Sequence, residues 1–236
     1  MDLKTWLLSR NGVLIVSVLL TLIVLAESLL PPWAPFFVIY AVLAICIPLA
    51  LKTYRFGRFR TVMASAWLLT LAIFVLDVIW DQGMWGWLYP RVLDGFGVGA
   101  DPFWSVDAAM EAMLQKTVPD LGVSLETSQM LLAFFMLIWA PIGEELFYRG
   151  YVYGTLRKRH SFWAAALISA AFFGVRHATH FFYLWPQVPW AAAGAWAVST
   201  FGYGMYISYL YEKTDSLYPP ILEHVLINIV WAVAAL

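Results

Sequence analysis

Long hydrophobic runs separated by short polar breaks make up most of this chain. About 20 consecutive apolar residues are enough for a helix to cross a bilayer, and about seven runs approach or exceed that length. The runs are Gly12–Leu30, Trp33–Leu51, Thr61–Ile79, Ser128–Leu156, Ser161–His180, Trp190–Tyr211 and Leu217–Leu236. The pattern predicts an all-α fold, a polytopic transmembrane helical bundle.

One long segment of more polar character, Trp80–Thr127, interrupts the series after the third run. Its tryptophans are typical of a membrane interface. Within it, Asp101 followed by Pro102 resembles a helix start, and Trp104–Val118 has the pattern of an amphipathic helix lying on the membrane. We therefore expect one long exterior loop here.

The basic residues support this alternation of spans. With the N-terminus inside, ten of the 14 Lys and Arg fall on the cytoplasmic side, and only Arg91 and Lys116 fall on the other. The ten are Lys4, Arg10, Lys52, Arg55, Arg58, Arg60, Arg157, Lys158, Arg159 and Lys213. This asymmetry predicts a multi-pass protein with a cytoplasmic N-terminus, and the small size of the chain favours a bacterial inner (plasma) membrane.

Composition narrows the class of protein further. At 62% hydrophobic and 12% charged residues, the chain has more apolar surface than a soluble fold of 236 residues can bury. The lipid bilayer is the expected partner, and a net charge of -1 gives no basis for nucleic-acid binding. The single cysteine, Cys46, excludes an internal disulfide framework. Because no internal repeat is visible, we expect residues 1–236 to form one integral membrane domain.

Two adjacent carboxylates and an arginine lie inside the fourth run. An ionisable side chain at this depth costs roughly 2.5–3.5 kcal/mol on insertion scales and usually has a function. Glu145 and Arg149 are one helical turn apart and can form an ion pair, while Glu144 points in another direction. An alternative is purely structural: the ion pair stabilises the helix, and Glu144 is a protonated, hydrogen-bonded acid.

Two later runs carry further polar residues. His177 and His180 are three apart in the fifth run, and His224 and Asn228 are four apart in the seventh, so each pair shares a helix face. We expect Glu144, His177, His224 and Asn228 to converge. His180, close to a span end, is more simply an interfacial histidine.

Three other charged positions are weaker candidates. Arg176 can snorkel or pair with an acid such as Asp77, and its role is open. Glu223 is expected in the first turn of the last helix, where a carboxylate suits the helix dipole, and we interpret it as structural.

A carboxylate, two imidazoles and an amide can activate water. The carboxylate takes the proton as general base, and an imidazole or amide donates to the oxyanion that forms. Glu144, His177 and His224 can equally hold a divalent metal such as Zn²⁺. The sequence has no His-Glu-x-x-His or paired-cysteine signature, so the metal question stays open.

Three motifs occur in order in these runs, and together they resemble the motifs of the CPBP family, also called Abi or type II CAAX prenyl endopeptidase-like intramembrane proteases. They are Glu144-Glu145-x-x-x-Arg149, Phe173-x-x-x-His177 and His224-x-x-x-Asn228. The resemblance covers residues 128–236. It implies that Glu144 activates water, that His177, His224 and Asn228 complete the site, and that Glu145 and Arg149 support it.

The resemblance leaves cofactor and substrate undetermined. The family has been described both as metalloproteases and as glutamate-dependent proteases, and only some members cleave prenylated C-terminal peptides. We expect an intramembrane endopeptidase that hydrolyses a peptide bond in a peptide or a lipidated protein tail. Two alternatives remain: a proton- or ion-coupled transporter that uses the same acids and histidines, and a catalytically silent membrane scaffold.

Overall fold

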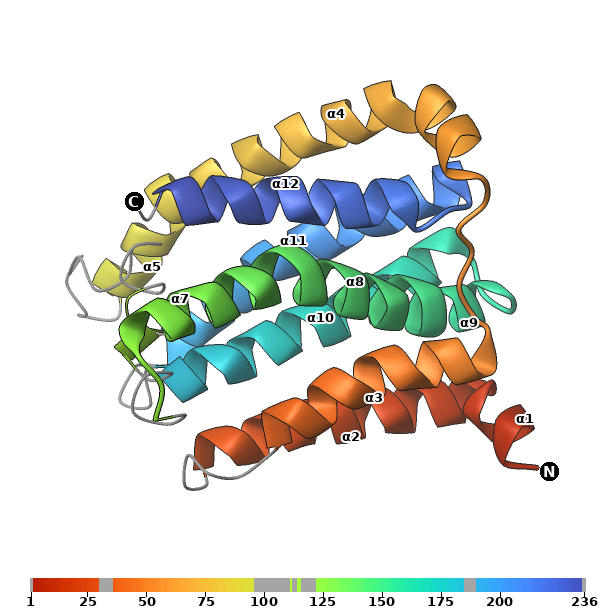
Figure 1. The fold of residues 1–236 in the computed structure, drawn as a ribbon, viewed down its shortest axis with the longest axis horizontal. Helices are drawn as coiled ribbons and strands as arrows, with labels where there is room; N and C mark the ends of the chain where they lie inside the picture. Colours follow the sequence, from red (N-terminus) through yellow and green to blue (C-terminus); the bar gives the residue numbers. More distant parts are fainter. Residues whose placement is uncertain are drawn as a thin grey trace.

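The computed structural model describes residues 2–29, 36–95, 111, 114–115, 122–184 and 190–234. Over these residues every regular element is a helix, which confirms the all-α prediction. Most of the long helices run side by side along the long axis of the molecule (Figure 1).

The N-terminal helices form a hairpin along one side of the bundle (Figure 1). Helix α1 spans Leu3–Leu7, α2 spans Arg10–Leu29 and α3 spans Phe36–Leu51. Asp2 caps α1, because its carboxylate accepts a hydrogen bond of 2.9 Å from the backbone N–H of Thr5.

The next helical run is longer than the sequence suggests. Helix α4 (Phe59–Gly83) continues without a break through the π-helical turn η1 (Met84–Leu88) into α5 (Tyr89–Gly95). The expectation of a loop from Trp80 onward is therefore wrong as far as Gly95, because the aromatic and aliphatic residues here continue the helix past its isolated glycines and acids. The predicted helix Trp104–Val118 lies largely outside the described residues.

A second continuous run crosses the middle of the bundle. It consists of α7 (Leu125–Phe134), η3 (Phe135–Trp139), α8 (Ala140–Glu144), η4 (Glu145–Tyr153) and α9 (Gly154–Arg157). Its start is capped by Ser124, whose hydroxyl accepts from the backbone N–H of Thr127 at 3.2 Å. The run contains the whole of the predicted fourth span, but two of its stretches are π-helical.

Three helices complete the bundle: α10 (Phe162–Leu184), α11 (Trp190–Thr214) and α12 (Tyr218–Ala234). Ser161 caps α10, since its hydroxyl accepts a hydrogen bond from the backbone N–H of Ala164 at 3.3 Å. Small residues bring α10 and α11 together: a Cβ on Gly174 would lie 2.5 Å from the carbonyl oxygen of Ala197. Because of this close approach, α11 packs directly against α10, and residues of both helices line one cavity.

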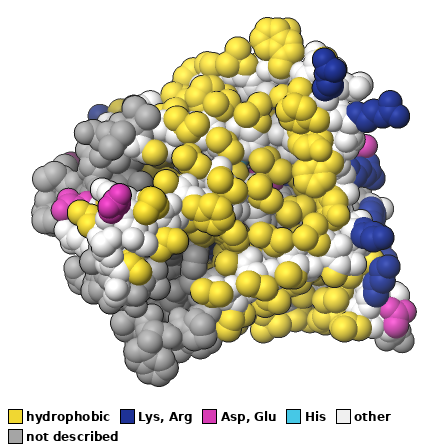
Figure 2. All heavy atoms as spheres, viewed as in Figure 1, with side chains coloured by type: hydrophobic (Ala, Val, Ile, Leu, Met, Phe, Trp, Pro, Cys, Tyr) yellow, Lys and Arg dark blue, Asp and Glu magenta, His cyan; other side chains and the backbone are white. Residues whose placement is uncertain are grey.

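The surface suits a lipid environment. Two described helical runs, Phe59–Val92 and Leu125–Arg157, are long and apolar enough to cross a membrane. Large apolar side chains on α4 such as Leu68 and Ile79 are more than 60% exposed. Hydrophobic side chains cover the face in Figure 2, and Lys and Arg gather along one edge. Seven spans remain a prediction.

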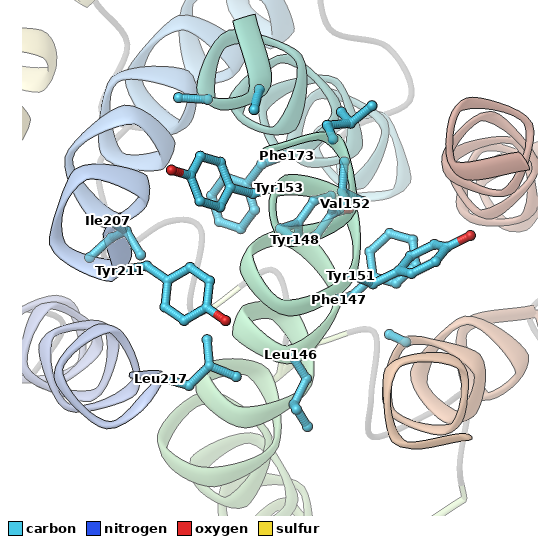
Figure 3. Packing of buried hydrophobic residues seen from close by; sticks show 14 of the residues in the cluster. Leu146, Phe147, Tyr148, Tyr151, Val152, Tyr153, Phe173, Ile207, Tyr211 and Leu217 are labelled. Atoms are coloured by element: carbon cyan, nitrogen blue, oxygen red, sulfur yellow. The ribbon is translucent and has the colours of Figure 1, made fainter. Parts of the chain in front are cut away.

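The buried centre of the bundle surrounds η4. Every residue of this segment is buried, and its aromatic side chains pack between α10, α11 and α3 (Figure 3). Tyr148 meets Phe173 edge-to-face at a centroid distance of 5.1 Å. The packed aromatic residues hold the two glutamates at the junction of α8 and η4 in the interior of the bundle.

Candidate active site

Glu145 connects two helices through one carboxylate. Its Oε2 lies 3.2 Å from Nε of Arg149, forming the ion pair expected from their spacing, and its Oε1 lies 2.9 Å from Nδ1 of His224 on α12. Arg149 also donates from Nη2 to the carbonyl of Gly204 at 3.4 Å. Because a carboxylate can only accept, Nδ1 of His224 carries a proton and Nε2 is the nitrogen left for chemistry.

Glu144 pairs with a different arginine. Its Oε1 lies 3.2 Å from Nη2 of Arg176, and both side chains are at most 3% exposed. The guanidinium of Arg176 lies 5.0 Å from the ring centroid of Tyr40 on α3, within cation–π range. Arg176 therefore pairs with an acid, one of the two roles considered for it, but the acid is Glu144 on α8 and not Asp77.

The other two predicted residues are held by backbone carbonyls. Nδ1 of His177 donates to the carbonyl of Phe173 at 2.9 Å, so Nε2 carries the lone pair. Nδ2 of Asn228 donates to the carbonyl of Met136 in η3 at 2.7 Å. A side-chain amide has two N–H groups, so Asn228 keeps one donor beyond this contact.

Four of the predicted residues share one cavity of about 140 Å³. Glu144, His177, His224 and Asn228 all contribute to its lining. This volume holds several water molecules. The cavity is also lined by Asp77, Trp80, Asp81, Phe135, Met136, Ala140, Phe173, Arg176, Trp196, Ser199, Thr200, Tyr203, Ile227 and Trp231. Glu145 and Arg149 lie behind the lining, where they hold His224.

The arrangement does not fit a divalent metal. Among the described residues, no group of three or more His, Cys, Asp and Glu side chains is placed to hold a metal ion. Glu144, the expected carboxylate ligand, already has the guanidinium of Arg176 at 3.2 Å, and this positive charge repels a second cation. The chemistry considered below uses no metal.

Comparison with known proteins gives one match. The family model described as type II CAAX prenyl endopeptidase Rce1-like matches residues 126–230. Residues 126–230, a little under half of the chain, are similar to this family. No curated protein and no solved structure matches the chain.

This match, together with the two apolar helical runs, supports a CAAX protease-like membrane protein. A transporter is not favoured. The matched segment includes all three motifs, but helices before it also reach the site. Tyr40 comes from α3 and Asp77 from α4, so the N-terminal half of the chain completes the surroundings of the CAAX protease-like segment.

Sequence reasoning missed the acidic part of this site. Glu223 is not in the first turn of α12, as expected, but one turn further in, fully buried against Asp77. The sequence of α4 could have indicated that Asp77 is buried. The inward positions of this helix recur at helical spacing among large apolar residues, and they are Ala66, Thr70, Ile73 and Asp77. The side chain of His180 lies outside the described residues.

Proposed function

We propose that this protein is an intramembrane endopeptidase in which Glu144 activates a water molecule to hydrolyse a peptide bond. The observation that carries the proposal is the shared cavity, where a carboxylate, two imidazoles and an amide from α8, α10 and α12 meet. The match of residues 126–230 to the type II CAAX prenyl endopeptidase model supports the same reaction class.

Each polar residue of the cavity has a separate role in the proposed hydrolysis. Arg176 holds one oxygen of Glu144, leaving the other to take a proton from water as its oxygen attacks the peptide carbonyl carbon. The remaining N–H of Asn228 is a donor for the oxyanion, and Nε2 of His224, oriented through Glu145, accepts a hydrogen bond from the attacking water. Collapse of the tetrahedral intermediate breaks the C–N bond, and Glu144 returns its proton to the leaving amine.

The substrate we propose is a peptide or a protein tail, with or without a prenyl group, that enters from the bilayer. In this proposal the basic edge of the bundle (Figure 2) faces the cytoplasm, on the same side as the N-terminus, as the positive-inside rule predicts. A bacterial inner membrane is the proposed location.

The test is hydrolysis by the purified protein in lipid nanodiscs. Glu144→Gln keeps the shape of the side chain but removes the base, and Arg176→Met removes the group that holds it. We expect both to lose at least about 10²-fold in kcat, the usual contribution of a general base. Arg176→Lys should recover part of the rate. Full activity in a folded Glu144→Gln protein would end the proposal.

A further inference from the structure

A basic pocket and an apolar groove lie in line along the junction of α2 and α10. The two helices pack against each other, and both begin at the end of the bundle where Lys and Arg gather (Figures 1 and 2). The basic pocket has a volume of about 440 Å³, and the groove further along the same two helices has about 350 Å³. The basic pocket is lined by Trp6, Ser9, Arg10, Asn11, Arg159 and His160.

The cations of the basic pocket have no carboxylate partner. None of the six lining residues is acidic, and among the described residues neither Arg10 nor Arg159 forms an ion pair. By contrast, the exposed Arg157 pairs with Glu212 at 2.9 Å. Nε2 of His160 is buried, and it too has no hydrogen-bond partner in the described part of the chain. Two free guanidinium groups and an imidazole in one pocket suit an anion such as a phosphate.

Neutral side chains add further donors to the basic pocket. The hydroxyl of Ser9 accepts a hydrogen bond of 3.0 Å from the backbone N–H of Gly12, so its own O–H stays available. Oδ1 of Asn11 accepts from Nε of Arg10 at 3.3 Å, which leaves the amide N–H groups of Asn11 and the terminal nitrogens of Arg10 for a ligand.

The groove offers hydrocarbon surface at the depth of lipid chains. Val18 lies eight residues after Arg10, and Ile168 lies eight after His160, so the groove begins about 12 Å beyond the basic pocket. This distance fits within one leaflet, whose hydrocarbon layer is about 15 Å thick. Its apolar lining residues are Val18, Leu22, Ile168, Ala171, Phe172 and Val175.

The groove is separate from the cavity of the proposed reaction. On α10 the groove uses Phe172 and Val175, whereas the cavity uses Phe173 and Arg176, which point from a different face of the helix. No residue of α2 lines the cavity. The ligand of the groove is therefore not the peptide that would lie in the cavity.

We propose that the basic pocket and the groove together bind one anionic phospholipid, with its phosphate in the pocket and an acyl chain in the groove. Basic pockets between membrane helices commonly hold anionic headgroups. The lipid ties α2 to α10 and so holds the N-terminal hairpin, which carries Tyr40, against the helix that carries Arg176. This site does not depend on the proposed hydrolysis.

Lipid binding by the full-length protein, purified in detergent and stripped of lipid, tests the site. Phosphatidylglycerol and phosphatidylcholine with the same acyl chains are titrated, and binding is followed by native mass spectrometry and by the melting temperature. We expect phosphatidylglycerol to bind on the order of 10-fold more tightly, because its net negative charge lies against two arginines. Arg10→Gln/Arg159→Gln should remove this preference.

Matched variants separate the site from general surface charge. Lys4→Gln/Lys158→Gln removes two positive charges from exposed positions outside the pocket and should keep the preference. Ala171→Trp fills the groove and should weaken binding of phosphatidylglycerol, whereas Val198→Trp, on the exposed face of α11, should not.

A soluble ligand separates a lipid site from a phosphate site. Glycerol 3-phosphate has the phosphate but no acyl chain, and it should leave the melting temperature unchanged at concentrations where phosphatidylglycerol raises it. An equal rise with both ligands would assign the pocket to a soluble phosphate compound and overturn the lipid site. Equal binding of the two lipids by the unmodified protein, or an equal loss of preference in the lysine variant, would overturn it as well.

Discussion

Oε1 of Glu145 lies 2.9 Å from Nδ1 of His224, and this contact fixes α12 against η4 at the centre of the bundle. The same carboxylate neutralises Arg149 with its other oxygen. One side chain therefore supports a buried cation and also sets which ring nitrogen of His224 faces the cavity.

Glu145→Gln should be strongly destabilising, because it leaves the buried guanidinium of Arg149 without its counter-charge. We expect a loss of about 3–5 kcal/mol in the free energy of unfolding, the usual cost of breaking a buried pair from one side. Denaturant unfolding in detergent micelles measures it. Asp215→Asn breaks the exposed pair with Arg55 and is the matched control, with an expected cost of at most about 1 kcal/mol.

The double variant Glu145→Gln/Arg149→Met removes both buried charges. It should recover a large part of the stability lost in Glu145→Gln, while activity stays low because His224 has lost its charged partner. Equal stability of wild-type and Glu145→Gln proteins would show that the pair does not hold the bundle together.

Activity should not depend on a divalent metal. The positive charge of Arg176 lies 3.2 Å from Glu144 and repels a second cation, so prolonged dialysis against EDTA or 1,10-phenanthroline should leave the rate within about two-fold. Elemental analysis of the purified protein is the companion measurement. Loss of activity on chelation, restored by stoichiometric Zn²⁺, would contradict the mechanism proposed here.

Gly202 sets the distance between α11 and α4. A Cβ at this position would lie 2.4 Å from the ring of Trp80, whose Nε1 donates to the carbonyl of Ser199 at 2.9 Å. Gly202→Ala should displace the ring and cost about 1–3 kcal/mol, as overpacking does. Gly194→Ala on the same helix meets nothing within 4 Å and should gain up to about 1 kcal/mol from helix propensity.

Melting temperatures of the two glycine variants, recorded side by side, separate packing from propensity. Displacing Trp80 should also disturb the cavity that it lines, so Gly202→Ala should lower kcat/KM while Gly194→Ala does not. Similar melting temperatures for both variants would mean that α4 yields freely around the added methyl group.

Glu212 should make stability depend on acid pH. Partial burial acts to raise the pKa of this carboxyl, but hydrogen bonds from Tyr153 and Arg157, with the charge of Arg157, outweigh it and lower the pKa below 4.5. A lowered folded-state pKa gives stability above the unfolded pKa that is lost as pH falls through the folded value. The gap in melting temperature between wild type and Glu212→Gln should therefore be largest above pH 5 and close at lower pH.

Much of the helical framework follows from hydropathy alone. The central run is long because Met130 to Trp139 contains no polar residue, and α10 begins where Ser161 can cap it. The extension of α4 through Trp80 could not be predicted, because interfacial tryptophans and isolated glycines fit a loop and a helix equally well.

For the site, spacing predicts pairs within one helix but not contacts between helices. Glu145 and Arg149 form a pair that one helical turn requires. The contact of Glu144 with Arg176 depends on how α8 and α10 pack, and the contact of Asp77 with Glu223 depends on α4 and α12, which are distant in sequence. The π-helical geometry of η4 likewise has no sequence signal that we can identify.

The contact between Glu145 and His224 joins residues 79 positions apart. At about 5–20 residues per second, a ribosome needs roughly 4–16 s to make that stretch. During this interval the acid is already synthesised but its imidazole partner does not yet exist. In the mechanism proposed above, the site is therefore incomplete until α12 docks.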